Sequence, residues 1–99
     1  MIAACVEVKN ELIHAIHPYG QALTCQVIDY GEQVIMPGLV DSHVHINEPG
    51  RTEWEGFNTA TQAAAAGGIT ALVDMPLNCI PVTTTKAAFQ EKLTAVKDK

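Results

Sequence analysis

The stretch MPGLVDSHVHINEPGR, residues 36–51, decides how the rest of the chain is organised. It contains a Pro-Gly turn, a short apolar strand and a polar loop that follows the carboxyl end of that strand. Side chains alternate between the two faces of a strand, so we expect His43 and His45 on the same side. Two neighbouring imidazoles can ligate one metal ion. A His-x-His pair alone is more often structural, because histidine is commonly half-buried without being a ligand, so the surrounding sequence has to decide.

The composition is that of a folded, acidic domain. The chain has 99 residues, of which 47% are hydrophobic and 17% charged, and this length allows one domain at most. A formal net charge of -5 provides no basic face, so we expect neither nucleic acid nor a membrane as a partner. Cys5, Cys25 and Cys79 are odd in number and widely spaced, which predicts reduced thiols in an intracellular, cytoplasmic protein. No apolar run approaches the ~20 residues of a transmembrane helix.

Residues 1–36 are predicted to form a β-rich lead. β-Branched residues favour strands over residues 2–8 and 12–16, and the short polar segment between them predicts a hairpin. Residues 26–30 and 33–36 are two further runs that we expect to be extended.

From residue 37 onward the pattern alternates between strand and helix. A strand is predicted at residues 39–45, then a helix that ends at the two glycines of residues 67–68, then an almost entirely apolar strand at residues 69–75. Thr84 or Thr85 can cap a last helix. The predicted fold class is therefore α/β, with the β-α-β-α order that builds parallel sheets and barrels.

Local signals refine both helices. Thr52 and Glu55 have the spacing of a capping box, which predicts that the first helix begins there. Trp54 and Phe57 are interpreted as packing residues between this helix and the sheet. The last helix is expected to bury its apolar side, formed by Ala88, Phe89, Leu93 and Val96.

The side chains that could ligate a metal or take part in catalysis lie at the carboxyl ends of the predicted strands. In parallel barrels, catalytic residues lie at these ends and in the loops that follow. His43 and His45 end one strand and Asp74 ends the next. The remaining polar residues of the following loops are Asn47, Glu48, Arg51 and Asn78.

Several motifs, in order along the chain, resemble those of one enzyme group. They are PGLVDSHVH (37–45), HINEPGR (45–51), WEGF (54–57), AAGGIT (65–70) and DMPLN (74–78). The chain resembles the cyclic amidohydrolases, which comprise allantoinases, dihydroorotases and dihydropyrimidinases. Within this group it is most similar to the allantoinases, because of residues 45–51. A chain of motifs in the same order is far more specific than His-x-His alone.

The resemblance implies a fold and a metal centre. Residues 37–99 would be the first two strand–helix units of a (β/α)8 TIM barrel, and residues 1–36 part of a small β-rich domain. His43 and His45 would bind one of two Zn2+ ions. The carboxylated lysine that bridges the two ions, two further histidines and the catalytic aspartate are expected from later strands and are not present in this chain. The complete enzyme is expected to be a homo-oligomer.

The resemblance also implies a reaction. The enzyme would open the hydantoin ring of a small-molecule substrate, allantoin, to give allantoate in purine degradation. Asp41 shares the parity of the histidines and is interpreted as support behind the metal ligands, with a purely structural role as the alternative. Asn47 stands where dihydroorotases carry arginine for a substrate carboxylate; an amide suits a neutral ureido group, although a turn-forming role is the alternative. Asn78 is a second candidate substrate contact, whereas Asp74 and Arg51 are interpreted as structural.

The length leaves most of such an enzyme unaccounted for. A TIM barrel takes ~250 residues, so this chain has length for two of eight units. We therefore expect an N-terminal or internal portion of a longer protein, which contains no catalytic base and is inactive alone. One alternative is a dihydropyrimidinase-like or dihydroorotase-like enzyme. Another is a truncated, non-catalytic chain that acts as an interaction module.

Overall fold

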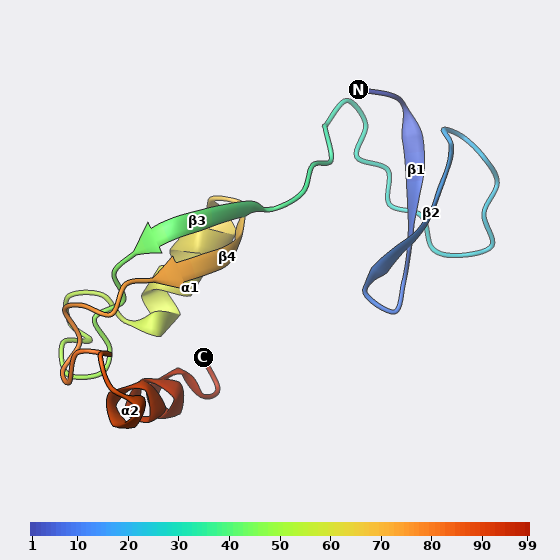
Figure 1. Ribbon diagram of the computed structural model, residues 1–99. Helices are drawn as coiled ribbons and strands as arrows, with labels where there is room; N and C mark the ends of the chain where they lie inside the picture. The colour runs from blue at the N-terminus through green and yellow to red at the C-terminus, as the bar shows by residue number, and fades with distance from the viewer. The chain divides into compact units, whose positions relative to one another are not determined.

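The computed structural model describes all 99 residues, which divide into two units, Met1–Val34 and Ile35–Lys99 (Figure 1). In the first unit, β1 (Ala4–Lys9) pairs antiparallel with β2 (Leu12–Pro18). Asn10 and Glu11 join them with φ angles of 51° and 64°, the left-handed pair that a tight two-residue hairpin requires. The predicted hairpin is confirmed.

The remainder of the first unit contains no strand. Residues 26–30 and 33–36, which we expected to be extended, pair with no other segment and form no strand. An isolated run becomes a strand only when another backbone satisfies its N–H and C=O groups, and β1 and β2 pair only with each other. Val27 and Ile28 are accordingly 58% and 65% exposed.

The second unit has the predicted β-α-β-α order. It consists of β3 (Leu39–Val44), α1 (Phe57–Ala66), β4 (Ile69–Asp74) and α2 (Lys86–Val96). β3 and β4 pair in parallel, and α1, which connects them in the sequence, packs on β4 (Figure 1). The carboxyl ends of both strands therefore meet at one edge, which is where the predicted site residues follow. The α/β class is confirmed for this unit.

The start of α1 differs from the sequence prediction. Thr52 lies in a turn, and the helix begins only at Phe57. The carboxylate of Glu48 accepts a hydrogen bond from the Phe57 N–H at 3.0 Å, and the Thr59 hydroxyl accepts one from the Gly56 N–H at 3.3 Å. A carboxylate from the preceding loop thus caps the first N–H of the helix, and the local Thr-x-x-Glu motif is not used.

The other helix ends follow the sequence signals. The N–H of Gly67 donates to the Ala63 carbonyl at 3.0 Å, and Gly68 leaves the helix with φ 75°. At the start of α2, the Thr85 hydroxyl accepts from the Ala88 N–H at 3.2 Å. The prediction of a threonine cap is confirmed for Thr85.

The core of the second unit lies at the carboxyl ends of the strands and in the loops beyond them. Its buried apolar residues are Ile46, Phe57, Ala64, Cys79 and Ala88. Trp54, predicted to pack inside, is 62% exposed, because it lies in the turn before the helix. On α2, Phe89 and Leu93 are likewise half-exposed, and Lys92 is buried in their place.

Candidate metal centre

The two histidines converge at the carboxyl end of β3. His43 is the fifth residue of the strand and His45 follows its last residue, so both side chains leave on the same face, as alternation predicts. Their Nε2 atoms lie 3.1 Å apart, the ring centroids lie 5.1 Å apart, and the ring planes are inclined by 53°.

This arrangement fits a metal ion between the rings. Neutral imidazole offers one nitrogen lone pair, and two unprotonated Nε2 atoms cannot hydrogen-bond to each other. When two nitrogens bind the same tetrahedral zinc ion, each at about 2.0–2.1 Å, the two nitrogens lie about 3.3 Å apart. The separation of 3.1 Å between His43 and His45 is close to that spacing.

Asp41 and Asn78 flank the histidine pair from two different segments. A carboxylate oxygen of Asp41 accepts a hydrogen bond from the His43 backbone N–H at 3.1 Å, and so supports the strand end. The Asn78 side-chain amide lies 3.3 Å from His45 Nδ1. Asn78 adopts φ 67°, and its carbonyl accepts from the Arg51 guanidinium at 3.2 Å. The loop after β4 is thus tied to the loop after β3.

Asn47 is buried with a free side-chain oxygen. The residue is 7% exposed, and its Oδ1 has no hydrogen-bond partner in this structure. The hydrogen bonds that shape the turn use its backbone, because its N–H donates to the Glu55 carbonyl and its carbonyl accepts from the Arg51 N–H. A buried carbonyl oxygen without a hydrogen-bond partner destabilises the fold by about 1–3 kcal/mol. The Asn47 side-chain oxygen is therefore available to accept a hydrogen bond from a ligand or from a further segment.

Glu48 serves the loop as a buried anion. It is 8% exposed; its carboxylate contacts the Lys99 ammonium and accepts from the Phe57 N–H. The hydrogen bond from Lys99, followed by the one from Phe57, lowers the pKa of this carboxyl despite its burial. Arg51 does not pair with Glu48 and lies 4.6 Å from the ring centroid of Trp54.

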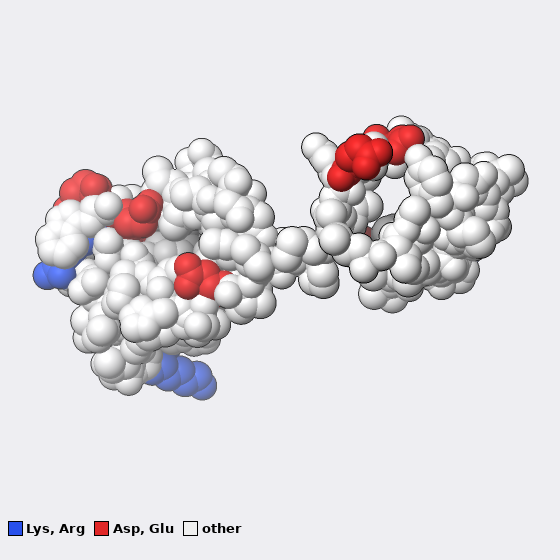
Figure 2. Space-filling model, turned by 90° about the horizontal axis from the view of Figure 1, so that it is seen from above, with Lys and Arg blue, Asp and Glu red and all other residues white.

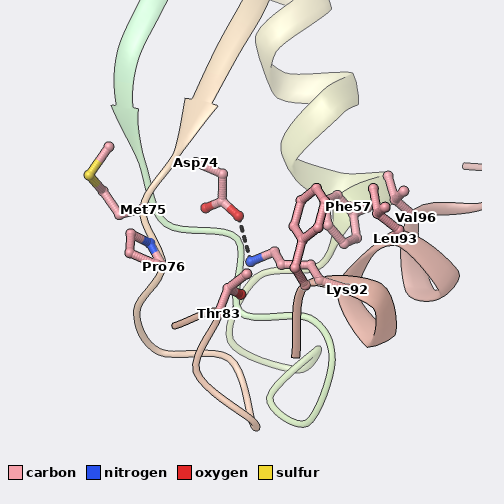
Figure 3. Close-up of a pocket in the computed structure, with 9 residues that line it drawn as sticks. Phe57, Asp74, Met75, Pro76, Thr83, Lys92, Leu93 and Val96 are labelled. Atoms are coloured by element: carbon pink, nitrogen blue, oxygen red, sulfur yellow. Dashed lines mark ion pairs between the residues drawn. The ribbon is translucent and has the colours of Figure 1, made fainter. Parts of the chain in front are cut away.

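Lys92 is the residue that sequence reasoning missed. Its ammonium forms an ion pair with the Asp74 carboxylate (Figure 3), at a distance of 2.5 Å. The same ammonium donates to the Ile46 carbonyl at 2.8 Å. The other oxygen of Asp74 accepts from the Ile46 N–H at 2.8 Å. A signal was present, because Lys92 stands four residues from both Ala88 and Val96, on the buried face of α2.

A pocket of about 290 Å³ opens beside this ion pair (Figure 3). Its apolar wall comes from α2, from Phe57 and from the start of the loop after β4, and its polar part from Asp74, Thr83 and Lys92. Neither His43 nor His45 lines it, so it is separate from the candidate metal centre.

The chain contains no cluster of three or more His, Cys, Asp or Glu side chains placed to hold a metal. The charged side chains visible in Figure 2 form small, separate groups on a largely uncharged face.

In the first unit, His17 is paired with Glu7 at 2.8 Å. This hydrogen bond lowers the pKa of the half-exposed Glu7 carboxyl.

Comparison with known proteins agrees with a metal-binding role for the histidine pair. Residues 34–97 match the model of the amidohydrolase family, a span that includes both histidines and the whole β-α-β-α segment. The chain belongs to the amidohydrolase family. Amidohydrolases generally depend on a metal ion, which agrees with the paired Nε2 atoms of His43 and His45.

Three curated amidohydrolase relatives match nearly all of this chain. The probable allantoinase of Oryza sativa subsp. japonica is 59% identical over 97% of the chain. The protein named "Allantoinase, mitochondrial" of Aquarana catesbeiana is 50% identical over 97%, and the allantoinase of Arabidopsis thaliana is 50% identical over 100%. The chain spans about a fifth of the length of these relatives, between 20% and 21%. Neither of its helices has the length and apolarity needed to cross a membrane.

Proposed function

We propose that this chain supplies the first metal ligands of a zinc-dependent cyclic amide hydrolase that opens the hydantoin ring of allantoin to allantoate. The observation that carries the proposal is the separation of 3.1 Å between the Nε2 atoms of His43 and His45. Relatives named allantoinase, 50–59% identical over nearly all of the chain, support the substrate.

The proposed architecture is a (β/α)8 barrel that begins at residue 37, preceded by a small β-rich domain to which residues 1–36 belong. A parallel β3–β4 pair with a helix on one side supports this architecture. Leu39, Val40 and Val73 are 48–64% exposed, as expected of strand residues that further barrel elements would cover. We still predict that the complete protein is a homo-oligomer and that it is located in the cytoplasm. The three free cysteines agree with a reducing compartment.

His43 and His45 would hold one of two zinc ions, which supplies Lewis acidity toward the ring carbonyl and lowers the pKa of a bound water. Both imidazoles must then be neutral with a lone pair on Nε2. Asp41 would support them from behind, because its contact with the His43 N–H holds the end of the strand. The bridging carboxylated lysine, the remaining ligands and the general base would come from segments beyond this chain.

Asn47 and Asn78 are proposed to contact the substrate. The free Oδ1 of Asn47 can accept from a ureido N–H of allantoin. The Asn78 side-chain nitrogen Nδ2 also lies 3.3 Å from His45 Nδ1, so the same residue contacts one of the proposed metal ligands. Asn78→Ala is therefore expected to weaken both zinc affinity and substrate binding.

The experiment is a substrate profile of the full-length protein, offering allantoin, dihydroorotate and dihydrouracil. Ring opening of allantoin, lost with a chelator and restored by zinc, is the expected result. His43→Ala should abolish the activity, whereas His14→Ala, an exposed histidine of β2, should leave it unchanged. A preference for dihydroorotate or dihydrouracil would contradict the proposed substrate and indicate another type of amidohydrolase. If no ring is opened at all, the proposed hydrolase activity is wrong.

A further inference from the structure

The backbone of Ile46, the residue directly after the second histidine, is held entirely by side chains. Its N–H donates to Asp74 Oδ1 at 2.8 Å, and its carbonyl accepts from Lys92 Nζ at 2.8 Å. The same ammonium lies 2.5 Å from Asp74 Oδ2. These three contacts form a closed ring, which we call the Ile46 clamp, defined by Ile46, Asp74 and Lys92.

The clamp replaces a strand ladder that has ended. β3 ends at Val44, and Ile46, 3% exposed, has its backbone groups beyond the last strand pairing and away from water. Buried backbone groups need partners, and here a carboxylate from the end of β4 and an ammonium from α2 provide them. Lys92 is itself 8% exposed, and a buried ammonium is tolerated only when it is paired and hydrogen-bonded.

The clamp acts on the two residues next to Ile46. Peptide groups are planar, so the N–H of Ile46 fixes the plane shared with His45, and its carbonyl fixes the plane shared with Asn47. The direction in which each neighbouring side chain leaves the backbone depends on the orientation of its plane. The clamp therefore restrains the backbone from which the His45 side chain leaves, and the His45 Nε2 atom lies 3.1 Å from His43 Nε2 in the structure.

We propose that Asp74 and Lys92 are positioning residues for the metal ligand His45, so that α2 controls the affinity of the centre although none of its residues ligates the metal. The ligand concerned is a divalent metal ion with imidazole coordination, and the inference rests on the proposed function only through that ion. Groups that orient metal ligands change metal affinity about 10- to 100-fold when removed. We expect an effect of that size.

The test uses the full-length protein and three variants, Lys92→Met, Asp74→Asn and the double variant. Zinc affinity is measured by competition with a chelator, the ligand geometry by the visible absorption of the cobalt-loaded protein, and stability by chemical unfolding. Each single variant leaves one buried group without its partner charge, so both should lose stability. The double variant removes both charges, and it should recover stability over the single variants.

Zinc affinity should not recover in the double variant, because methionine offers no donor to the Ile46 carbonyl. We expect it to stay about 10- to 100-fold weaker than in the wild type, with an altered cobalt spectrum. Lys86→Met, an exposed lysine at the start of α2, is the matched control and should bind zinc normally. This separation of stability from affinity is what a purely structural role would not produce.

Two results would overturn the inference in different ways. If the wild type binds zinc tightly and the double variant binds it equally well with the same cobalt spectrum, the clamp is structural only, and the proposed function is untouched. If the wild type binds no zinc and opens no allantoin ring, the proposed function fails, and the positioning role fails with it. A single variant that does not fold does not affect the test, because the double variant carries no lone buried charge.

Discussion

Alanine at position 50 should destabilise the second unit through a contact between its two long loops. Gly50 adopts φ 89°, a conformation that residues with a Cβ rarely take. A Cβ built there would lie 2.6 Å from Ile80 Cβ, 2.8 Å from the Ile80 carbonyl oxygen and 3.1 Å from Ile80 Cα. Two of these atoms are backbone, so the loop after β4 would have to move.

The expected magnitude has a backbone part and a packing part. The left-handed conformation costs about 1–2 kcal/mol for a residue with a Cβ. Displacing Ile80 adds an overpacking term of about 1–3 kcal/mol. It also endangers the hydrogen bond from the Ile80 N–H to the Pro49 carbonyl, 2.8 Å in the structure, which is worth about 1 kcal/mol. Gly50→Ala should therefore lower the free energy of unfolding by about 3–6 kcal/mol.

Gly68→Ala is the matched control for the conformational part. Gly68 has φ 75°, and a Cβ added to it would meet no atom within 4 Å. It should lower the free energy of unfolding by only about 1–2 kcal/mol in the same urea titration of the full-length protein. Equal destabilisation by the two variants, within about 0.5 kcal/mol, would refute the claim that the loops are in close contact at Gly50.

Three further predictions concern the cap of each helix and the chain in isolation. The Glu48 carboxyl has a lowered pKa from its contacts with Lys99 and Phe57, so its stabilising contribution is complete above about pH 4.3 and is lost as the pH falls through the lowered pKa. Unfolding at pH 3 to 7 should therefore show a shallower acid loss of stability for Glu48→Gln than for the wild type; equal slopes would contradict this. Thr85→Ala removes the hydroxyl that caps the Ala88 N–H and should cost about 1 kcal/mol in chemical unfolding, with no change expected in zinc affinity. The purified 99-residue chain should hydrolyse no allantoin, because it holds no cluster of three metal ligands; zinc-dependent ring opening by this chain would disprove that reasoning.

The parts of the fold that the sequence predicts are those encoded locally. The hairpin depends on Asn10 and Glu11, the end of α1 on two glycines, and the start of α2 on the Thr85 hydroxyl. Each signal lies within a few residues of the structure it determines. The convergence of His43 and His45 belongs to the same class, since strand alternation alone puts them on one face.

The two errors at the candidate site involve partners that the local sequence signals do not show. The beginning of α1 depends on Glu48, nine residues before Phe57, and so the nearer Thr-x-x-Glu signal was misleading. Lysine is almost never fully buried, so a residue-by-residue interpretation leaves Lys92 on the surface. Its burial depends on the Ile46 carbonyl, 46 residues away, and on a carboxylate at the end of β4. Such contacts become visible only once the loops are placed in space.

The most direct test of the central claim is an anomalous difference map at the zinc edge from crystals of the full-length protein. We predict a peak between the imidazoles at about 2.0–2.1 Å from Nε2 of both His43 and His45, with the remaining ligands from other parts of the protein. A zinc peak bound elsewhere, with both imidazoles engaged only in hydrogen bonds, would contradict the claim that these two histidines form the metal centre.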